Sequence, residues 1–134
     1  MACRFAGTAT NPEALWGMLA NGLDGWSDEA PDRFNLQSFW HPKADIGGSF
    51  ATRGLHLLKQ DPALFDADFF GIHNLEAGAM DPQQRLLLEV AYESIENAGI
   101  PLEKIRGSNT AVYCSTSNCD YEIMLSRSPE TAPK

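Results

Sequence analysis

Three cysteines and three histidines are the side chains of this chain that could act as nucleophiles, acid–base groups or metal ligands. They are Cys3, Cys114, Cys119, His41, His56 and His73. None lies in a CxxC or HExxH pattern, and no histidine stands at ligand spacing from a cysteine, so the sequence predicts no metal site. Because an odd number of cysteines cannot all pair, we expect reduced thiols.

Polar side chains that could contact a ligand follow the one segment with a clear strand signal. Residues 110–115, TAVYCS, combine β-branched, aromatic and small side chains, and Thr116, Ser117 and Asn118 come directly after them. So apolar a run is typical of an interior parallel strand, which needs neighbours on both edges and helices on both faces. Loops at the carboxyl ends of such strands gather around ligands in open α/β sheets. The sequence therefore predicts an α/β fold.

The strongest helix signal covers residues 79–99, AMDPQQRLLLEVAYESIENAG. We expect Asp81 to cap this helix, Pro82 to take its first position, Gln84 to complete a capping box and Gly99 to end it. Apolar side chains recur at three- and four-residue spacing and predict one buried stripe. Its members are Leu86, Leu87, Val90, Ala91, Ile95 and Ala98. Off the stripe, Glu89, Glu93 and Glu96 predict a solvated face.

The first part of the chain predicts one helix and one long loop. The helix starts at Asn11 with Pro12, ends at residues 21–22, and is expected to turn three apolar side chains inward, namely Leu15, Met18 and Leu19. Residues 23–60 have the Gly, Pro, Asp and Ser content of a loop. Its large aromatic side chains should pin it to a body. They are Trp26, Phe34, Phe39, Trp40 and Phe50.

Shorter elements are expected around the main helix. Residues 61–65 predict a helical turn, Phe69 and Phe70 are core candidates, and residues 102–105 predict a turn after the helix. The Ser-, Pro- and Thr-rich residues 126–134 predict a frayed end. No internal repeat or linker divides the chain.

Composition limits the classes of function. The chain has 134 residues, of which 43% are hydrophobic, as in one globular domain. Its net charge of −8 argues against nucleic acid as a partner, because phosphate binding depends on clustered Lys and Arg. No apolar run approaches the ~20 residues of a membrane span and no signal peptide is visible. We expect no membrane partner and a cytoplasmic location.

The whole chain resembles the N-terminal part of the β-ketoacyl synthase (ketosynthase) domain of type I polyketide synthases, the fungal highly reducing ones above all. The helix at residues 79–99 carries the resemblance most strongly. Further matches follow in the family's order: MACRF at residues 1–5, PEALW at 12–16, PDRFN at 31–35, FDADFF at 65–70, GS at 107–108, DY at 120–121 and PET at 129–131.

This resemblance implies a reaction and a fold. The family catalyses a decarboxylative Claisen condensation of acyl and malonyl thioesters carried on the phosphopantetheine of an acyl carrier protein. The implied fold is the thiolase-like layered α/β/α/β/α fold, of which residues 1–134 would form one partial domain. The implied partners are the carrier protein, its thioesters and a second ketosynthase subunit, and we expect no cofactor bound directly by this chain.

The resemblance also implies what the sequence lacks. The family's nucleophilic cysteine sits in a Thr-Ala-Cys-Ser-Ser type elbow and works with two histidines further on, and none of these three residues is present. An apolar first strand that usually precedes the segment resembling residues 1–5 is also missing. Since thiolate chemistry needs an acid–base partner, we expect this chain alone to be catalytically inactive, with no catalytic residue.

Individual residues keep two interpretations. Thr116 and Ser117 are candidates for substrate binding, because the resemblance puts their loop near the acyl pocket and the dimer contact, although the family usually has Gly where Cys114 stands. Arg85 could contact the acyl-channel side of the domain or pair with Glu89 one turn on, and local capping physics favours the pairing.

Two alternative functions stay open. The chain could be a non-enzymatic interaction module that docks on an intact synthase, or the functionless product of a truncated, split or degenerate gene.

Overall fold

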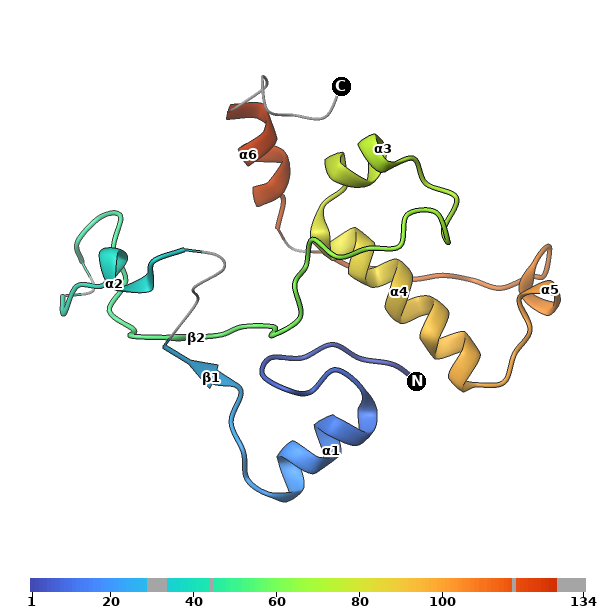
Figure 1. The fold of residues 1–134 in the computed structure, drawn as a ribbon, viewed down its shortest axis with the longest axis horizontal. Helices are drawn as coiled ribbons and strands as arrows, with labels where there is room; N and C mark the ends of the chain where they lie inside the picture. Colours follow the sequence, from blue (N-terminus) through green and yellow to red (C-terminus); the bar gives the residue numbers. More distant parts are fainter. Residues whose placement is uncertain (29–33, 44, 117, 128–134) are drawn as a thin grey trace. The chain divides into compact units, whose positions relative to one another are not determined.

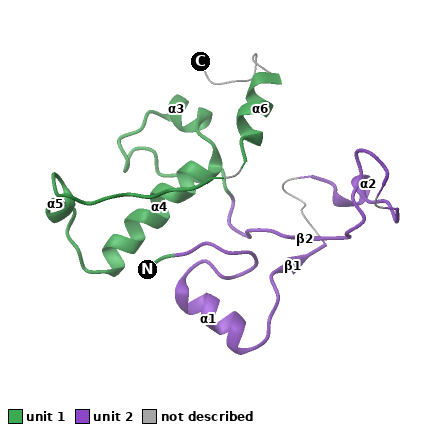
Figure 2. Cartoon of the chain, turned by 180° about the vertical axis from the view of Figure 1, so that it is seen from behind, with its two compact units in different colours: residues 1–2, 62–134 green, residues 3–61 purple. Residues whose placement is uncertain are grey.

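A computed structural model describes residues 1–28, 34–43, 45–116 and 118–127 of the protein (Figure 1). The chain forms two compact units (Figure 2): an N-terminal unit of residues 3–61, and a C-terminal unit of residues 62–134 together with residues 1–2. The N-terminal unit contains α1 (Pro12–Ala20), β1 (Trp26–Ser27), α2 (Leu36–Phe39) and β2 (Leu55–His56). The C-terminal unit contains α3 (Asn74–Ala79), α4 (Pro82–Asn97), α5 (Leu102–Ile105) and α6 (Asp120–Arg127).

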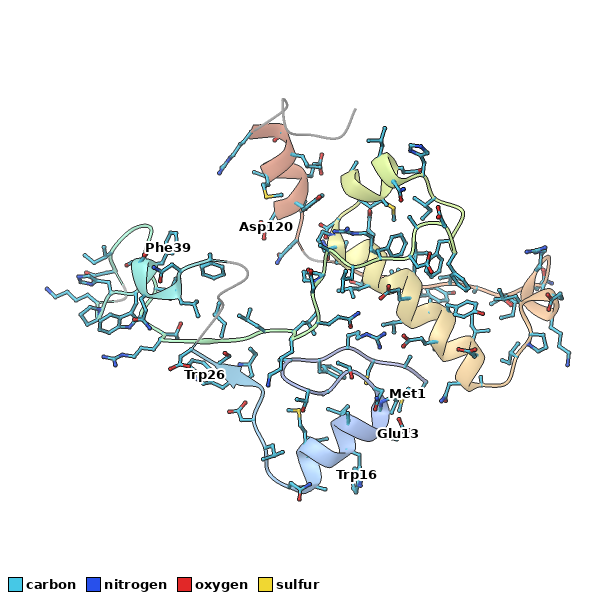
Figure 3. All side chains as sticks on the ribbon, viewed as in Figure 1. Met1, Glu13, Trp16, Trp26, Phe39 and Asp120 are labelled. Carbon is cyan, nitrogen blue, oxygen red and sulfur yellow. The ribbon has the colours of Figure 1, made fainter. Side chains whose placement is uncertain are left out.

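Helix α1 confirms the predicted bounds. The Asn11 side chain accepts a hydrogen bond from the Ala14 N–H at 2.8 Å, and Gly22 takes a φ of +61° just after the helix, a conformation that glycine adopts without strain. Leu15 and Met18 are half-buried as expected, but Leu19 is 64% exposed, so its predicted inward orientation is wrong. Trp16 also projects from α1 into open space (Figure 3).

The predicted long loop contains a small antiparallel sheet. Strands β1 and β2 pair with Trp26 opposite His56 and Ser27 opposite Leu55. A Cβ atom on Gly54 would overlap the Ser27 carbonyl oxygen and the Trp26 ring, so the chain can pass here only as glycine. Strands of two residues carry no alternation that a sequence could reveal, which is why the prediction missed them.

Aromatic rings hold this loop together. Phe39 stacks on Phe50 with ring centroids 6.3 Å apart and meets Phe34 edge-on at 6.1 Å. The Trp40 indole N–H donates to the Ala51 carbonyl at 3.1 Å, and the Arg53 guanidinium lies 4.5 Å from the centroid of the same ring system. The rings therefore pin the loop to itself, and the predicted separate body is not what they contact.

Helix α4 starts and ends where the sequence predicted, but with a different cap. Asp81 accepts from the Gln83 N–H at 2.9 Å, and the Gln83 side-chain amide donates back to Asp81 at 2.7 Å. Gln83 thus completes the cap, and the predicted capping box through Gln84 is wrong. Gly99, with a φ of +65°, ends the helix.

The predicted buried stripe of α4 is only half covered. Leu86, Val90 and Ile95 are half-buried, whereas Leu87 is 47% exposed and both Ala91 and Ala98 are exposed. No described residue of α4 is fully buried.

The charged side chains of α4 also depart from expectation. Glu89 and Glu93 are half-buried, so the predicted solvated acidic face is right only for Glu96. The expected ion pair between Arg85 and Glu89 does not form, and the Arg85 Nε atom is buried without a hydrogen-bond partner among the described residues.

An aromatic cluster packs against α4. Phe69 meets Tyr92 of α4 edge-on at 4.8 Å and Phe70 at 5.0 Å, and Phe70 stacks on Phe65 at 5.2 Å. Phe70 is half-buried but Phe69 is 55% exposed, so its prediction as a core residue is wrong. Residues 61–65 form turns and not a helical segment, and α3, which the sequence did not predict, follows them.

The predicted strand at residues 110–115 is not a strand. The segment has no ladder partner in the described structure, and Val112 and Tyr113 are 79% and 94% exposed. A strand needs a second strand to satisfy its backbone donors and acceptors, so the apolar pattern alone could not make one. The α/β class therefore holds only coarsely, as several helices with one described two-stranded sheet.

Little apolar surface is sequestered. The fully buried apolar residues of the described chain are Ala9, Leu36, Ala67 and Ala77. Three of these four are alanines, whose burial contributes little hydrophobic free energy. Within the same described ranges, no helix has the length and apolar character needed to cross a membrane. The expected frayed end lies mainly in residues 128–134, outside the described residues, while Ser126 and Arg127 belong to α6.

We expect the isolated chain to unfold without a sharp transition. Because so few large side chains are buried, far-UV circular dichroism should show helix while the near-UV signal stays weak and thermal melting stays gradual. A steep cooperative melt at the same temperature in both spectral regions would contradict this expectation.

A titratable pair in the N-terminal unit gives a second prediction. The His56 Nε2 atom lies 2.8 Å from the Asp24 carboxylate, which also accepts from the Trp26 N–H at 3.1 Å. The hydrogen bond from His56 lowers the pKa of Asp24 below its ordinary value. A lowered folded-state pKa means that the contact stabilises the unit above the ordinary aspartate pKa, and that this contribution disappears as pH falls through the lowered value.

Carbon-13 NMR titration of the Asp24 carboxyl checks this pair. We expect His56→Ala to raise the pKa of Asp24 toward its ordinary value, and His73→Ala, a matched histidine in the C-terminal unit, to leave it in place. An Asp24 titration that is unchanged by His56→Ala would refute the assignment.

Candidate functional site

A cavity of about 630 Å³ lies within the C-terminal unit, between the first turn of α4, residues 114–119 and helix α6. We name it the α4–α6 cavity. Its apolar lining includes Ala79, Leu87 and Leu125, and its polar lining includes Gln83, Thr116 and Asn118. Both the size and the mostly apolar wall with a few polar groups are typical of small-molecule sites.

The side-chain amide of Gln83 organises one wall of this cavity. Its oxygen accepts from the Thr116 hydroxyl at 2.6 Å, while its NH₂ group donates to the Asn118 carbonyl at 2.9 Å and to Asp81 at 2.7 Å. One residue of the helix cap thereby ties down a loop more than thirty residues further along the chain. The Thr116 hydroxyl proton is used in this bond, so toward a ligand Thr116 offers acceptor lone pairs.

The predicted site residues are placed unequally. Thr116 lines the α4–α6 cavity, as does Asn118. Ser117 lies outside the described residues. The structure adds Gln83, which the sequence analysis did not single out, since nothing in the sequence relates a helix cap to a distant loop.

Helix α6 forms the opposite wall and was also missed by the sequence analysis. The Tyr121 hydroxyl donates to the Gly78 carbonyl at 2.7 Å, satisfying a carbonyl at the end of α3. Tyr121 itself lines the cavity. The signal that could have revealed α6 is its charge order, with Asp120 and Glu122 in the first turn and Arg127 in the last.

The chemistry available in the cavity is binding. Cys114 and Cys119 line it, and both thiols are free. No histidine, lysine or arginine is among the described lining residues, so neither thiol has a base there to activate it. His73 is used elsewhere, as the cap of α3, where its ring accepts from the Leu75 N–H. Across the described ranges, no three His, Cys, Asp or Glu side chains cluster as metal ligands would.

Comparison with known proteins settles the family. Residues 1–133 match the family described as beta-ketoacyl synthase, N-terminal domain. The chain belongs to the β-ketoacyl synthase family. This confirms the resemblance that the helix at residues 79–99 predicted.

Individual ketosynthase relatives match over the full length of this chain. A lovastatin diketide synthase of Monascus pilosus is 53% identical over 134 residues, and one of Aspergillus terreus is 48% identical over 134 residues. A highly reducing polyketide synthase of Stachybotrys chartarum is 51% identical over 135 residues. Each match covers 100% of this chain but only 5%, 5% and 6% of the respective relative. The chain thus spans about one-twentieth of the length of these synthases.

Removal of the Gln83 amide should free the loop. We expect Gln83→Ala to speed amide hydrogen exchange across residues 115–119 by roughly tenfold or more, because each of its three hydrogen bonds contributes about 0.5–1.5 kcal/mol. Hydrogen exchange with mass spectrometry measures this. Gln84→Ala is the matched control, since the Gln84 side chain contacts the same cavity but makes no hydrogen bond to the loop. Equal exchange in both variants would contradict the anchoring role.

Proposed function

We propose that this chain is part of a ketosynthase domain that condenses acyl and malonyl thioesters in polyketide assembly. The family match over residues 1–133 carries this proposal. Residues 1–134 act in it as one partial domain of the layered α/β/α/β/α fold. The exposed Val112 and Tyr113 support this arrangement, because a segment so apolar would gain neighbouring strands in a complete sheet.

The substrate-binding role falls to the loop beside the α4–α6 cavity. Thr116 and Ser117 would contact the acyl thioester, with the apolar side chains Leu87 and Leu125 beside its hydrocarbon part. The cavity volume and its mostly apolar wall support an acyl ligand. Gln83 is a positioning residue in this scheme, because it holds Thr116 and does not itself need to touch substrate.

The partners follow from the same family. The acyl and malonyl groups arrive on the phosphopantetheine of an acyl carrier protein, and a second ketosynthase subunit completes a dimer. The proposed compartment is the cytoplasm. The relatives named above are diketide and highly reducing polyketide synthases, so a reduced polyketide is the product class we propose.

The chain by itself would not catalyse condensation. Acyl transfer needs a thiolate with an acid–base partner, and decarboxylation of the malonyl group needs groups that stabilise the developing enolate. Neither requirement is met by the described lining of the α4–α6 cavity. The exposed apolar side chains also fit the alternative of docking on an intact synthase, but no described contact favours that alternative over a missing part of the same domain.

A chimera tests the proposal together with the free chain. Purified alone with acyl and malonyl carrier protein, the chain should yield no condensation product by mass spectrometry. Grafted in place of the matching residues of the Monascus pilosus synthase, it should support condensation. Thr116→Val in the chimera should then lower kcat/KM for the acyl donor by about tenfold, through loss of one hydrogen bond at the cavity.

Two outcomes would overturn this proposal. One is turnover by the free chain. The other is a chimera that folds and dimerises like the parent synthase but forms no condensation product.

A further inference from the structure

Two thiols share the wall of one cavity. Cys114 and Cys119 both line the α4–α6 cavity, both are free, and both are exposed to solvent. Only residues 115–118 separate them in the chain. Cys3, the third cysteine, belongs to the N-terminal unit. The fold therefore gathers two of three thiols at one accessible place.

The intervening loop is folded back and not extended. Gln83 bonds to both Thr116 and Asn118, so the loop is tied to α4 at two points between the cysteines. Cys119 is fixed at the start of α6, where its carbonyl accepts from the Ile123 N–H at 3.2 Å. Cys114 lies in the segment without a strand partner, whose backbone is free of ladder bonds that would resist a small movement.

We propose that Cys114 and Cys119 form a reversible disulfide by exchange with a small disulfide such as oxidised glutathione. One thiolate attacks a glutathione sulfur, forming a mixed disulfide and releasing one glutathione thiolate. The second cysteine thiolate then attacks the bound cysteine sulfur, forming the intrachain bond and releasing the second glutathione. The two cysteines are oxidised, one glutathione disulfide is reduced, and the two cysteine protons leave to solvent or to the released thiolates.

The bond would act on the cavity itself. A disulfide requires Cβ atoms about 3.5–4.5 Å apart, so closing it draws residues 114 and 119 together across the loop that carries Thr116. The result is a shorter, stiffer wall on the α4–α6 cavity. This step needs no acyl substrate, so it does not depend on the condensing function proposed above.

Peptide mapping provides the test. The full chain is equilibrated under native conditions with reduced and oxidised glutathione, quenched, alkylated and digested with trypsin. Cleavage after Arg106 and Arg127 yields one peptide, residues 107–127, which holds Cys114 and Cys119, while Cys3 falls in residues 1–4. We expect the larger peptide to be lighter by two hydrogen atoms and to resist alkylation, and Cys3 to carry glutathione or the alkyl group.

Matched variants decide whether the fold brings the thiols together. In Cys114→Ser and Cys119→Ser, the remaining thiol should form only the mixed glutathione disulfide. Gln83→Ala should lower the fraction of intrachain disulfide at a given glutathione ratio by about tenfold in equilibrium constant, and Gln84→Ala should not change it.

The wild-type chain in concentrated urea should resemble Gln83→Ala or fall below it. The proposal is overturned if Cys114 and Cys119 take up glutathione separately under native conditions. It is equally overturned if the bridged peptide forms to the same extent in urea.

Discussion

Uncovered apolar surface is the constraint that governs this chain. The α4 stripe leaves Leu87 and Ala91 open, and beyond α5 Val112 and Tyr113 stand almost wholly in solvent. A hydrophobic face stabilises a fold only when another layer covers it. Local hydrogen bonds must therefore hold the described elements, and they do so through helix caps, short loops and aromatic pairs and not through a continuous core.

Local signals in the sequence predicted the helices well where capping chemistry was explicit. Asn11 with Pro12, and Asp81 with Pro82, mark helix starts that the structure places at the same residues. Helices α3 and α6 were missed because neither begins with Pro at its first position. The error at Gln84 has a physical cause as well, because a side chain two residues past the cap reached the same carboxylate from a shorter distance.

Long-range features were less accessible to sequence reasoning. The strand signal at residues 110–115 was one of composition, and strands form by pairing, which a segment cannot supply for itself. The candidate site was half found: Thr116 was named from its place after that segment, whereas its anchor Gln83 depends on a contact across more than thirty residues. The ketosynthase family, by contrast, was evident from the residues alone, since its motifs occur in order along the chain.

The Gln83 amide has a consequence for the chemical ageing of the protein. Deamidation would turn this glutamine into glutamate, replacing an NH₂ donor with a carboxylate oxygen. That oxygen would face the Asp81 carboxylate and the Asn118 carbonyl, two acceptors that need a donor. A single hydrolysed amide would thus convert attraction into repulsion at the junction of helix cap and loop, and an aged sample would show an altered cavity without any change in chain length.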